Sequence, residues 1–204
     1  MEPQMDPPLS ALDTLISTKI SPSSPHPAHL QALAIQIKHN LQHQHLWTDL
    51  QIHDYEPNQS PSHPESAQSA TAKPLPRPLI SGLPPTRLYI HPDEQMALLQ
   101  SQKEKGGLGL GDVESEREWV LPSHLREKWS LKKFGEVFDS IGVVPPAYVD
   151  RQEDGQGVAD RREEEGEEGN PWRKTKRVVL ATLDDDSTVV YYIVHDGIVK
   201  PRQN

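Results

Sequence analysis

The sequence has 204 residues, of which 34% are hydrophobic, 20 are proline and none is cysteine. A formal net charge of -9 argues against RNA binding by bulk electrostatic attraction, and the lack of cysteine excludes disulfides and Cys-based zinc sites. Few hydrophobic residues and many prolines predict a compact core carrying disordered segments. We expect neither a secretory signal in residues 1–27 nor a membrane span, because no apolar run approaches the ~20 residues that a spanning helix needs.

The first part of the chain predicts a tail, a helix and a strand. Residues 1–26 are rich in Pro and Ser, and we expect them to form a disordered tail. The next segment has the apolar period of an amphipathic helix: Leu30, Leu33, Ala34, Ile37 and Leu41. Residues 46–52 then alternate in polarity and predict a strand. Leu46, Thr48, Leu50 and Ile52 would lie on one side of it.

The middle of the chain alternates between expected loops and short elements. Residues 57–78 carry many prolines and predict a linker. Residues 87–90 (Arg-Leu-Tyr-Ile) predict a short strand, and Pro92 with the acids after it suits the first turn of a helix. A further flexible loop is expected over residues 101–116, because it contains the glycine-rich run 106–111, which lacks the Gly-Lys-Ser/Thr of a phosphate-binding loop.

The third part predicts a strand, a helix and an acidic loop. Residues 118–121 predict the strand, and Ser130 is a candidate N-cap for the helix. The helix would bury one face: Leu131, Phe134, Phe138 and Ile141. Residues 147–172 are expected to form a solvated loop, because residues 150–168 hold nine acidic and three basic residues and so contribute -6 of the net charge. The rest of the chain is therefore close to neutral.

The last thirty residues predict a β-hairpin. Residues 176–183 and 188–194 are β-branched apolar runs, and the polar residues Asp184, Asp185, Asp186 and Ser187 separate them. The second run is apolar on both faces, with Val189, Tyr191 and Ile193 on one side and Val190, Tyr192 and Val194 on the other. A strand of this kind must be covered on both faces, and a partner protein is the economical cover.

Several sequence blocks carry a family resemblance. They are residues 186–192 with Asp196, Gly197 and Pro201, and the shorter blocks 46–50, 87–92 and 118–122. The chain resembles the small non-catalytic subunit, of the "Sen-fifteen" type, of the eukaryotic tRNA-splicing endonuclease, in particular its fungal members. The pattern predicts an α+β fold, a small mixed sheet with two or three amphipathic helices. Residues 27–204 would form one domain interrupted by loops 57–78, 101–116 and 147–172, and the resemblance implies an endonuclease-like C-terminal region.

The resemblance implies an architectural function. The chain would be a structural subunit of a four-subunit complex that removes introns from pre-tRNA, and its hairpin would dock onto a catalytic subunit. It implies self-association in isolation and a nuclear location, with a cytoplasmic or organelle-surface location left open. In the family, the acidic turn inserts into a basic groove of a neighbouring subunit. The expected interface is therefore Asp184, Asp185, Asp186, Val189, Val190, Tyr191, Tyr192, Ile193 and Val194.

Other residues allow different functions. An active metal-independent ribonuclease would need a base, an acid and a cation, for which Tyr89, His91 and Lys176 are candidates, but no motif unites them. A general adaptor without an RNA function is a third hypothesis. Contact with RNA phosphates is open to one basic cluster: Arg173, Lys174, Lys176 and Arg177. The alternative interpretation is that the cluster is a charged strand start whose positive charge balances the negative charge of the acidic loop.

The histidines give no clear metal site. His39 and His43 have helical i, i+4 spacing, but the Glu of an H-E-x-x-H motif is missing, which favours a polar solvent-facing surface. We therefore expect no catalytic residues, no metal and no cofactor.

Overall fold

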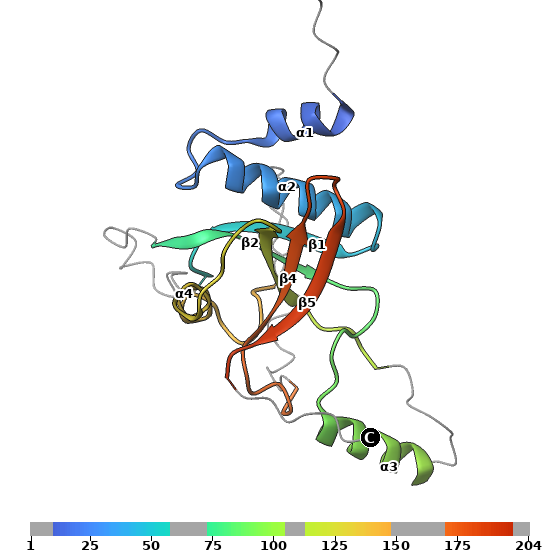
Figure 1. The fold of residues 1–204 in the computed structure, drawn as a ribbon. Coiled ribbons are helices and arrows are strands. Elements are labelled where there is room, and N and C mark those ends of the chain that lie inside the picture. Colours follow the sequence, from blue (N-terminus) through green and yellow to red (C-terminus); the bar gives the residue numbers. More distant parts are fainter. Residues whose placement is uncertain (1–9, 58–72, 105–112, 148–169, 198–204) are drawn as a thin grey trace, which may run out of the picture.

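The computed structural model describes residues 10–57, 73–104, 113–147 and 170–197. These residues form a five-stranded mixed sheet with helices around it (Figure 1). The strands are β1 (Thr48–Tyr55), β2 (Pro74–Leu83), β3 (Glu118–His124), β4 (Arg177–Leu183) and β5 (Val189–His195). The helices are α1 (Ala11–Lys19), α2 (Ala28–His43), α3 (Pro92–Glu104) and α4 (Leu131–Asp139). The α+β class with a mixed sheet is confirmed.

The strands follow one another across the sheet in chain order, from β1 to β5. Neighbours pair antiparallel except β3 and β4, which run parallel, with Val120 opposite Val179. A parallel pair needs a long crossover connection, and here that connection contains α4. Strand β5 thus lies at one edge of the sheet, as the last strand of the chain.

Helix α2 covers one face of the sheet. Leu33, Ile37 and Leu41 pack with Ile80 of β2 and Val120 of β3, as the predicted helical period requires. Burial of each such side chain contributes about 1.5–3 kcal/mol relative to exposure. The predicted strand over residues 46–52 is wrong at its start, because β1 begins at Thr48. Before it, Leu46 is 68% exposed and Trp47 is buried.

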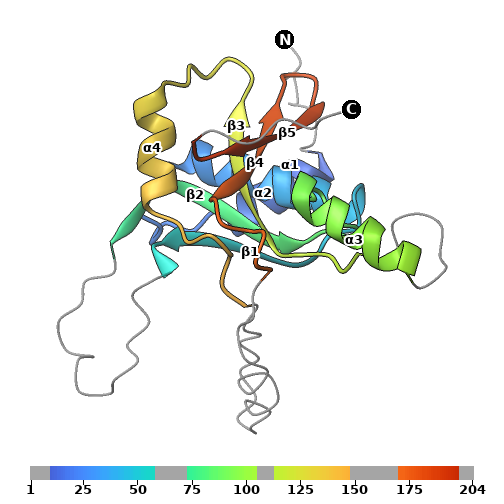
Figure 2. The same ribbon diagram turned by 90° about the horizontal axis from the view of Figure 1, so that it is seen from below.

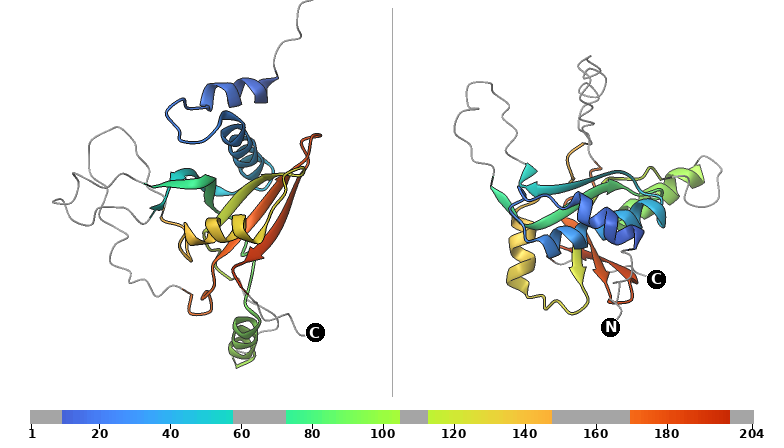
Figure 3. Two further views of the ribbon diagram at one scale, coloured as in Figure 1. Left: turned by 60° about the vertical axis from the view of Figure 1, so that its left-hand side comes forward. Right: turned by 90° about the horizontal axis from the view of Figure 1, so that it is seen from above.

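Helix α4 lies on the other face of the sheet (Figure 3). The predicted N-cap is confirmed, since the Ser130 hydroxyl accepts a hydrogen bond from Lys133 N at 3.3 Å. The predicted apolar face is corrected at its start: Leu131 is 91% exposed, whereas Val137 is buried. Because α4 is short, its last turn and Ile141 make the main contact with the sheet core.

The expected disordered tail contains helix α1, so that prediction is wrong for residues 11–19. The Ser10 side chain accepts from Asp13 N at 3.1 Å, and Asp13 accepts from the Ser10 hydroxyl at 2.7 Å. The Ser10 side chain thus caps one free backbone N–H at the start of the helix, and the Asp13 carboxylate holds the Ser10 hydroxyl in place. Figure 1 shows α1 lying over α2, on the side away from the sheet.

The expected linker over residues 57–78 is wrong at its end, because β2 begins at Pro74. Strand β2 pairs with β3 only over Ile80, Ser81 and Gly82, so its prolines lie where no β3 residue is opposite. Prolines are tolerated in such edge-like stretches because no ladder donor is required there. The expected strand over residues 87–90 is also wrong, and these residues form an unpaired connection.

Helix α3 was expected, and it continues to Glu104, beyond the predicted start of the loop at residue 101. Figure 2 shows α3 well separated from α4. The glycine run 106–111 and the acidic stretch 150–168 lie outside the described residues. None of the helices described is both long and apolar enough to cross a membrane.

Candidate functional site

Strand β5 of the β4–β5 hairpin is partly packed on each face and keeps an apolar surface exposed. Val189 and Tyr191 pack toward the core beneath α2, and the Tyr191 hydroxyl donates to Asn40 Oδ1 at 2.6 Å. Burial raises the pKa of Tyr191, so its hydroxyl stays neutral. Val194 packs on the opposite side, against the core beneath α4. The described residues therefore cover both faces of β5 only in part.

The remaining apolar residues of β5 are exposed. Val190 is 45% exposed, Tyr192 58% and Ile193 39%. Strand β5 pairs with β4 on one side, and no described strand pairs with its other side. An exposed apolar edge strand invites pairing with another chain. We call Val190, Tyr192, Ile193 and the free backbone of β5 the β5 edge.

The acidic turn, residues 184–187, has an ordered backbone. Asp184 N donates to Thr188 O at 2.9 Å, and Ser187 adopts a φ of 68°. The Asp184 carboxylate accepts from Asp185 N at 2.7 Å, and that of Asp186 accepts from Thr188 N at 2.8 Å. Hydrogen bonds from Thr188 lower the pKa of Asp186. Two of the three carboxylates thus shape the turn itself.

The third carboxylate of the turn connects the hairpin to the end of β3. Asp185 Oδ1 lies 3.2 Å from His124 Nε2, and Asp185 Oδ2 is paired with Arg126. Gln36 of α2 also reaches the turn, donating to the Ser187 hydroxyl at 3.5 Å. These contacts hold the turn in a defined position above α2.

The basic cluster at the start of β4 divides into buried and exposed residues. Arg173 and Arg177 are 8% and 5% exposed. The acidic loop that the cluster was expected to balance lies outside the described residues. Glu118, 1% exposed, accepts from Arg173 Nη2 at 3.0 Å and from Arg177 Nε at 3.1 Å. Glu116 accepts from Arg177 Nη2 at 2.8 Å. Both guanidinium groups are therefore occupied by glutamates rather than available to phosphate.

The same network reaches α3. Arg87 is paired with Glu116 and lies 3.3 Å from a carboxylate oxygen of Glu94. Burial alone would raise the pKa of Glu116, but the Asn170 hydrogen bond and the three arginine charges lower it. The buried network thus holds α3 and the segment before β4 against the sheet.

The two lysines of the cluster behave differently from the arginines. Lys176 Nζ donates to the carbonyl of Phe138, near the end of α4, at 2.6 Å. Lys174 is exposed. RNA contact remains a prediction for the cluster, and Lys174 is the member whose charge is most accessible.

The residues of the alternative ribonuclease hypothesis have separate surroundings. Tyr89 packs its ring on His195 at a centroid distance of 4.7 Å and beneath the Arg177 guanidinium. His91 stacks with Trp172 at 6.2 Å, and Lys176 caps α4. No hydrogen bond or ring contact joins Tyr89, His91 and Lys176 within the described ranges. Each of the three residues is thus engaged in a different contact.

The histidine pair on α2 is not accompanied by further metal ligands. The rings of His39 and His43 lie 4.4 Å apart and tilted. Among the residues that the structure describes, no cluster of three or more His, Cys, Asp or Glu could hold a metal ion.

Two parts of this site have no signal in the local sequence. The buried network joins glutamates and arginines that are far apart along the chain, so no local pattern reveals it. His124 ends β3 and Arg126 lies two residues after it, and only the parallel pairing of β3 with β4 places them beside Asp185. Helix α1 did carry a signal, the Ser10 and Asp13 caps before Leu15 and Ile16.

Comparison with known proteins identifies the class of chain to which this fold and hairpin belong. The model of the family described as "Sen15 protein" matches residues 36–153 and 156–204. These ranges cover most of the chain, including the sheet and the hairpin. The chain belongs to the Sen15 family.

Particular relatives are fungal proteins. The chain is 44% identical over 178 residues to the "Probable tRNA-splicing endonuclease subunit tsp-1" of Neurospora crassa, covering 86% of this chain and 67% of the relative. It is 32% identical over 94 residues to the "Probable tRNA-splicing endonuclease subunit sen15" of Schizosaccharomyces pombe, 46% of this chain and 54% of the relative. A stretch of 29 residues is 62% identical to the "tRNA-splicing endonuclease subunit SEN15" of Eremothecium gossypii, 14% of this chain and 25% of the relative.

Proposed function

We propose that this chain is a non-catalytic structural subunit of a tRNA-splicing endonuclease, the complex that cleaves pre-tRNA at its splice sites. The observation that carries the proposal is the β5 edge, where Tyr192 is 58% exposed on the strand that follows the acidic turn. Membership of the Sen15 family and the names of the fungal relatives supply the complex. The chain contributes architecture, and a partner subunit contributes the reacting groups.

The interface is the β5 edge together with the acidic turn. The edge offers unpaired backbone groups and apolar side chains, which suit strand addition or an apolar seam with a catalytic subunit. The turn offers carboxylates on an ordered backbone, which suit Arg or Lys side chains of that subunit. In isolation, the same edge pairs two copies of the chain.

The proposed function also implies the binding partners of this chain. They are the catalytic and structural subunits of a heterotetrameric endonuclease, and pre-tRNA is contacted through the assembled complex. We place the protein in the nucleus, with the cytoplasm and organelle surfaces as the other locations to be tested. Fluorescence imaging of the tagged full chain distinguishes these locations.

A non-catalytic role is supported by the surroundings of Tyr89, His91 and Lys176. Metal-free RNA cleavage requires the base, the acid and the cation to converge on one phosphate. In this chain Lys176 is bound to the Phe138 carbonyl at 2.6 Å, and His91 stacks on Trp172. The geometry therefore favours the architectural function over the ribonuclease.

The test is co-purification of the full chain with tagged catalytic subunits. We expect Tyr192→Glu to abolish capture, because it places a charge in the apolar edge. Leu131→Glu is the matched control, because Leu131 is an exposed apolar residue on α4, outside the proposed interface, with 91% of its surface accessible. Equal loss with both variants, or no capture of the wild-type chain, would refute the proposed interface and leave the adaptor hypothesis in its place.

A further inference from the structure

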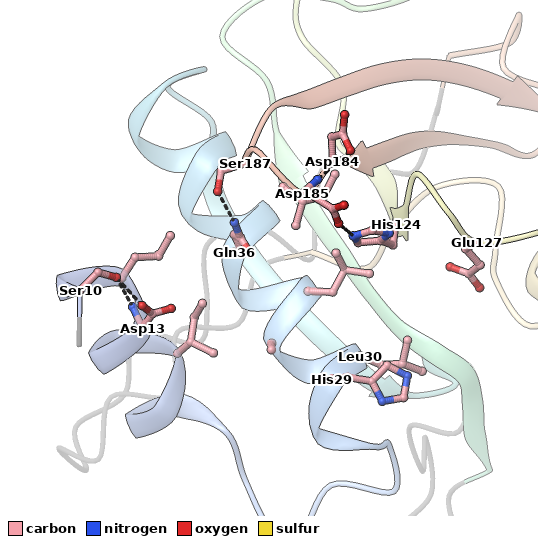
Figure 4. A pocket seen from close by; sticks show the side chains of 15 residues that line it. Ser10, Asp13, His29, Leu30, Gln36, His124, Glu127, Asp184, Asp185 and Ser187 are labelled. Atoms are coloured by element: carbon pink, nitrogen blue, oxygen red, sulfur yellow. Dashed lines mark hydrogen bonds and ion pairs between the residues drawn. The ribbon is translucent and has the colours of Figure 1, made fainter. Parts of the chain in front are cut away.

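A groove with a volume of about 840 Å³ crosses α2 between α1 and the acidic turn. Figure 4 shows Ser10 and Asp13 of α1 on one side of α2, and Asp184, Asp185 and His124 on the other. The volume lies within the range of roughly 300–1,000 Å³ that ligand-binding pockets span. The proposed interface described above uses the turn but not the groove behind it.

The inner surface of the groove is apolar. It is lined by Leu12 and Ile16 of α1, Leu30 and Leu33 of α2, and Leu183 of β4. Leu12 and Ile16 are half-buried, and α1 has no buried residue. The apolar side of α1 is therefore only partly covered by the rest of the described chain. A segment laid in the groove would bury these side chains further.

The rim of the groove is acidic. Among the described residues that line it, Asp13, Glu127, Asp184 and Asp185 carry carboxylates, and none is Lys or Arg. Glu127 is paired with Arg77 at 2.8 Å and Asp185 with Arg126, and His124 also contacts Asp185.

Two carboxylates on opposite sides of the groove remain without a cation. Asp13 accepts from the Ser10 hydroxyl, and Asp184 accepts from the backbone of Asp185. Neither carboxylate has an ion-pair partner within the described ranges. The pair therefore favours an occupant that brings positive charge to both sides of α2.

We infer that this groove binds a basic amphipathic helix, with Leu, Ile or Met on one face and Lys or Arg on the edges of that face. Apolar anchors fit the inner surface, and the cations meet Asp13 and Asp184. RNA is disfavoured because its phosphates would face the acidic rim. The inference rests on the proposed function in one respect: the helix belongs to another subunit of the complex, since the groove is continuous with the acidic turn.

Binding of a fluorescein-labelled helical peptide tests the inference. The probe is a roughly 18-residue Lys/Leu peptide with Leu at i, i+3, i+4 and i+7, and the comparison is a Glu/Leu peptide of the same pattern. Fluorescence anisotropy with the full chain should show binding of the Lys/Leu peptide alone, weakening with added salt. Amide shifts in a ¹H–¹⁵N spectrum should concentrate at Leu12, Ile16 and Gln36.

The decisive variants keep the local hydrogen bonds and remove charge. Asp13→Asn with Asp184→Asn retains both acceptor oxygens, and we expect the peptide Kd to rise about tenfold. Glu136→Gln with Asp139→Asn is the matched control, because these exposed acids of α4 remove the same two charges and do not line the groove. Its Kd should stay within about twofold of wild type. Ile16→Lys, with helix content checked by circular dichroism, should also abolish binding.

Equal affinity for both peptides, an equal effect of the control, or shifts confined to the β5 edge would overturn the inference. Preference for a single-stranded RNA over the Lys/Leu peptide would overturn it as well. Co-purification with the catalytic subunits separates the two proposals. If the peptide binds in a manner that depends on Asp13 and Asp184 but the subunits are not captured, the proposed complex is refuted. The proposal that the groove binds a basic helix then stands. Capture without such binding refutes the groove alone.

Discussion

His124 Nε2 lies 3.2 Å from Asp185 Oδ1, so the end of β3 is paired with the turn between β4 and β5. Arg126 pairs with the second oxygen of the same carboxylate. The turn is thereby held in place before any partner binds. A pre-formed turn loses less conformational entropy on docking than a flexible one, which favours its use in an interface.

We predict that removing the charges of the acidic turn weakens assembly but not folding. Changing Asp184, Asp185 and Asp186 to Asn keeps one acceptor oxygen on each side chain, removes three negative charges and breaks the ion pair between Asp185 and Arg126. The Kd for the catalytic subunit should rise at least about tenfold, whereas Tm should change by no more than about 4 °C. Isothermal titration and thermal scanning measure the two effects.

The control for this variant is Glu163, Glu164 and Glu165 changed to Gln, which removes the same charge outside the turn. Its Kd should match wild type. An equal weakening by both variants would mean that overall charge, rather than the turn, governs assembly.

We predict that the buried charge network is needed for stability. Glu118→Ala leaves the guanidinium groups of Arg173 and Arg177 without a main partner in the interior. Breaking a buried pair on one side costs about 3–5 kcal/mol of unfolding free energy. Urea denaturation measures the loss.

Lys174→Ala serves as the comparison for Glu118→Ala, since Lys174 is exposed between the two arginines. It should change stability by no more than about 0.5 kcal/mol. Similar stabilities for Glu118→Ala and wild type would contradict a structural role for the network.

Two glycines give opposite predictions. A Cβ at Gly82 would lie 2.5 Å from Leu50 Cδ2 and 3.1 Å from Trp47, so Gly82→Ala should destabilise the fold by about 1–3 kcal/mol. A Cβ at Gly135, within α4, has no described atom inside 4 Å. Gly135→Ala should therefore stabilise by about 0.5–1 kcal/mol, since alanine favours the helix. Urea denaturation of both variants tests the packing around β2 and α4, and the same sign for both would contradict it.

We predict that stability falls as the pH drops below the ordinary histidine range. Burial, with a smaller effect from Arg117, lowers the pKa of His53 to about 4, and its ring is hydrogen-bonded to the Ser81 hydroxyl at 2.8 Å. The unfolded chain binds this proton near pH 6.5. Stability from neutral His53 is therefore complete above about pH 6.5 and is lost as pH falls toward about 4.

The expected slope from His53 is on the order of 1 kcal/mol per pH unit in that window. His195, whose pKa burial also lowers, acts in the same direction. His53→Gln should reduce the slope of unfolding free energy against pH, measured by urea titration between pH 4 and 7. An unchanged slope would contradict a neutral buried His53.

Local patterns were sufficient where one residue or one period determines the element. The period of α2, the Ser130 cap of α4 and the two apolar runs of the hairpin belong to this group. Strand β2 could not be predicted, because Pro74, Pro76 and Pro78 indicate a linker unless the absence of an opposing β3 residue is known. The fate of the basic cluster depended on Glu118, which is 55 residues from Arg173.

The candidate site likewise has features that local sequence predicts and features that depend on distant residues. Sequence could indicate that β5 is apolar on both sides, but not that Tyr191 turns inward to Asn40 while Tyr192 stays exposed. That outcome depends on α2 covering only one face of the hairpin. The groove beside the turn could not be predicted either, because α1 forms one of its sides. The Pro- and Ser-rich sequence around α1 predicts a disordered tail.

The most direct measurement is pre-tRNA cleavage by the purified chain, by the purified catalytic subunits, and by their mixture. The architectural account predicts that the chain alone is inactive, that adding it to the catalytic subunits produces or strongly raises cleavage at the splice sites, and that Tyr192→Glu removes this gain. Cleavage by the chain alone, abolished by His91→Ala, would contradict the account and establish a catalytic subunit in its place.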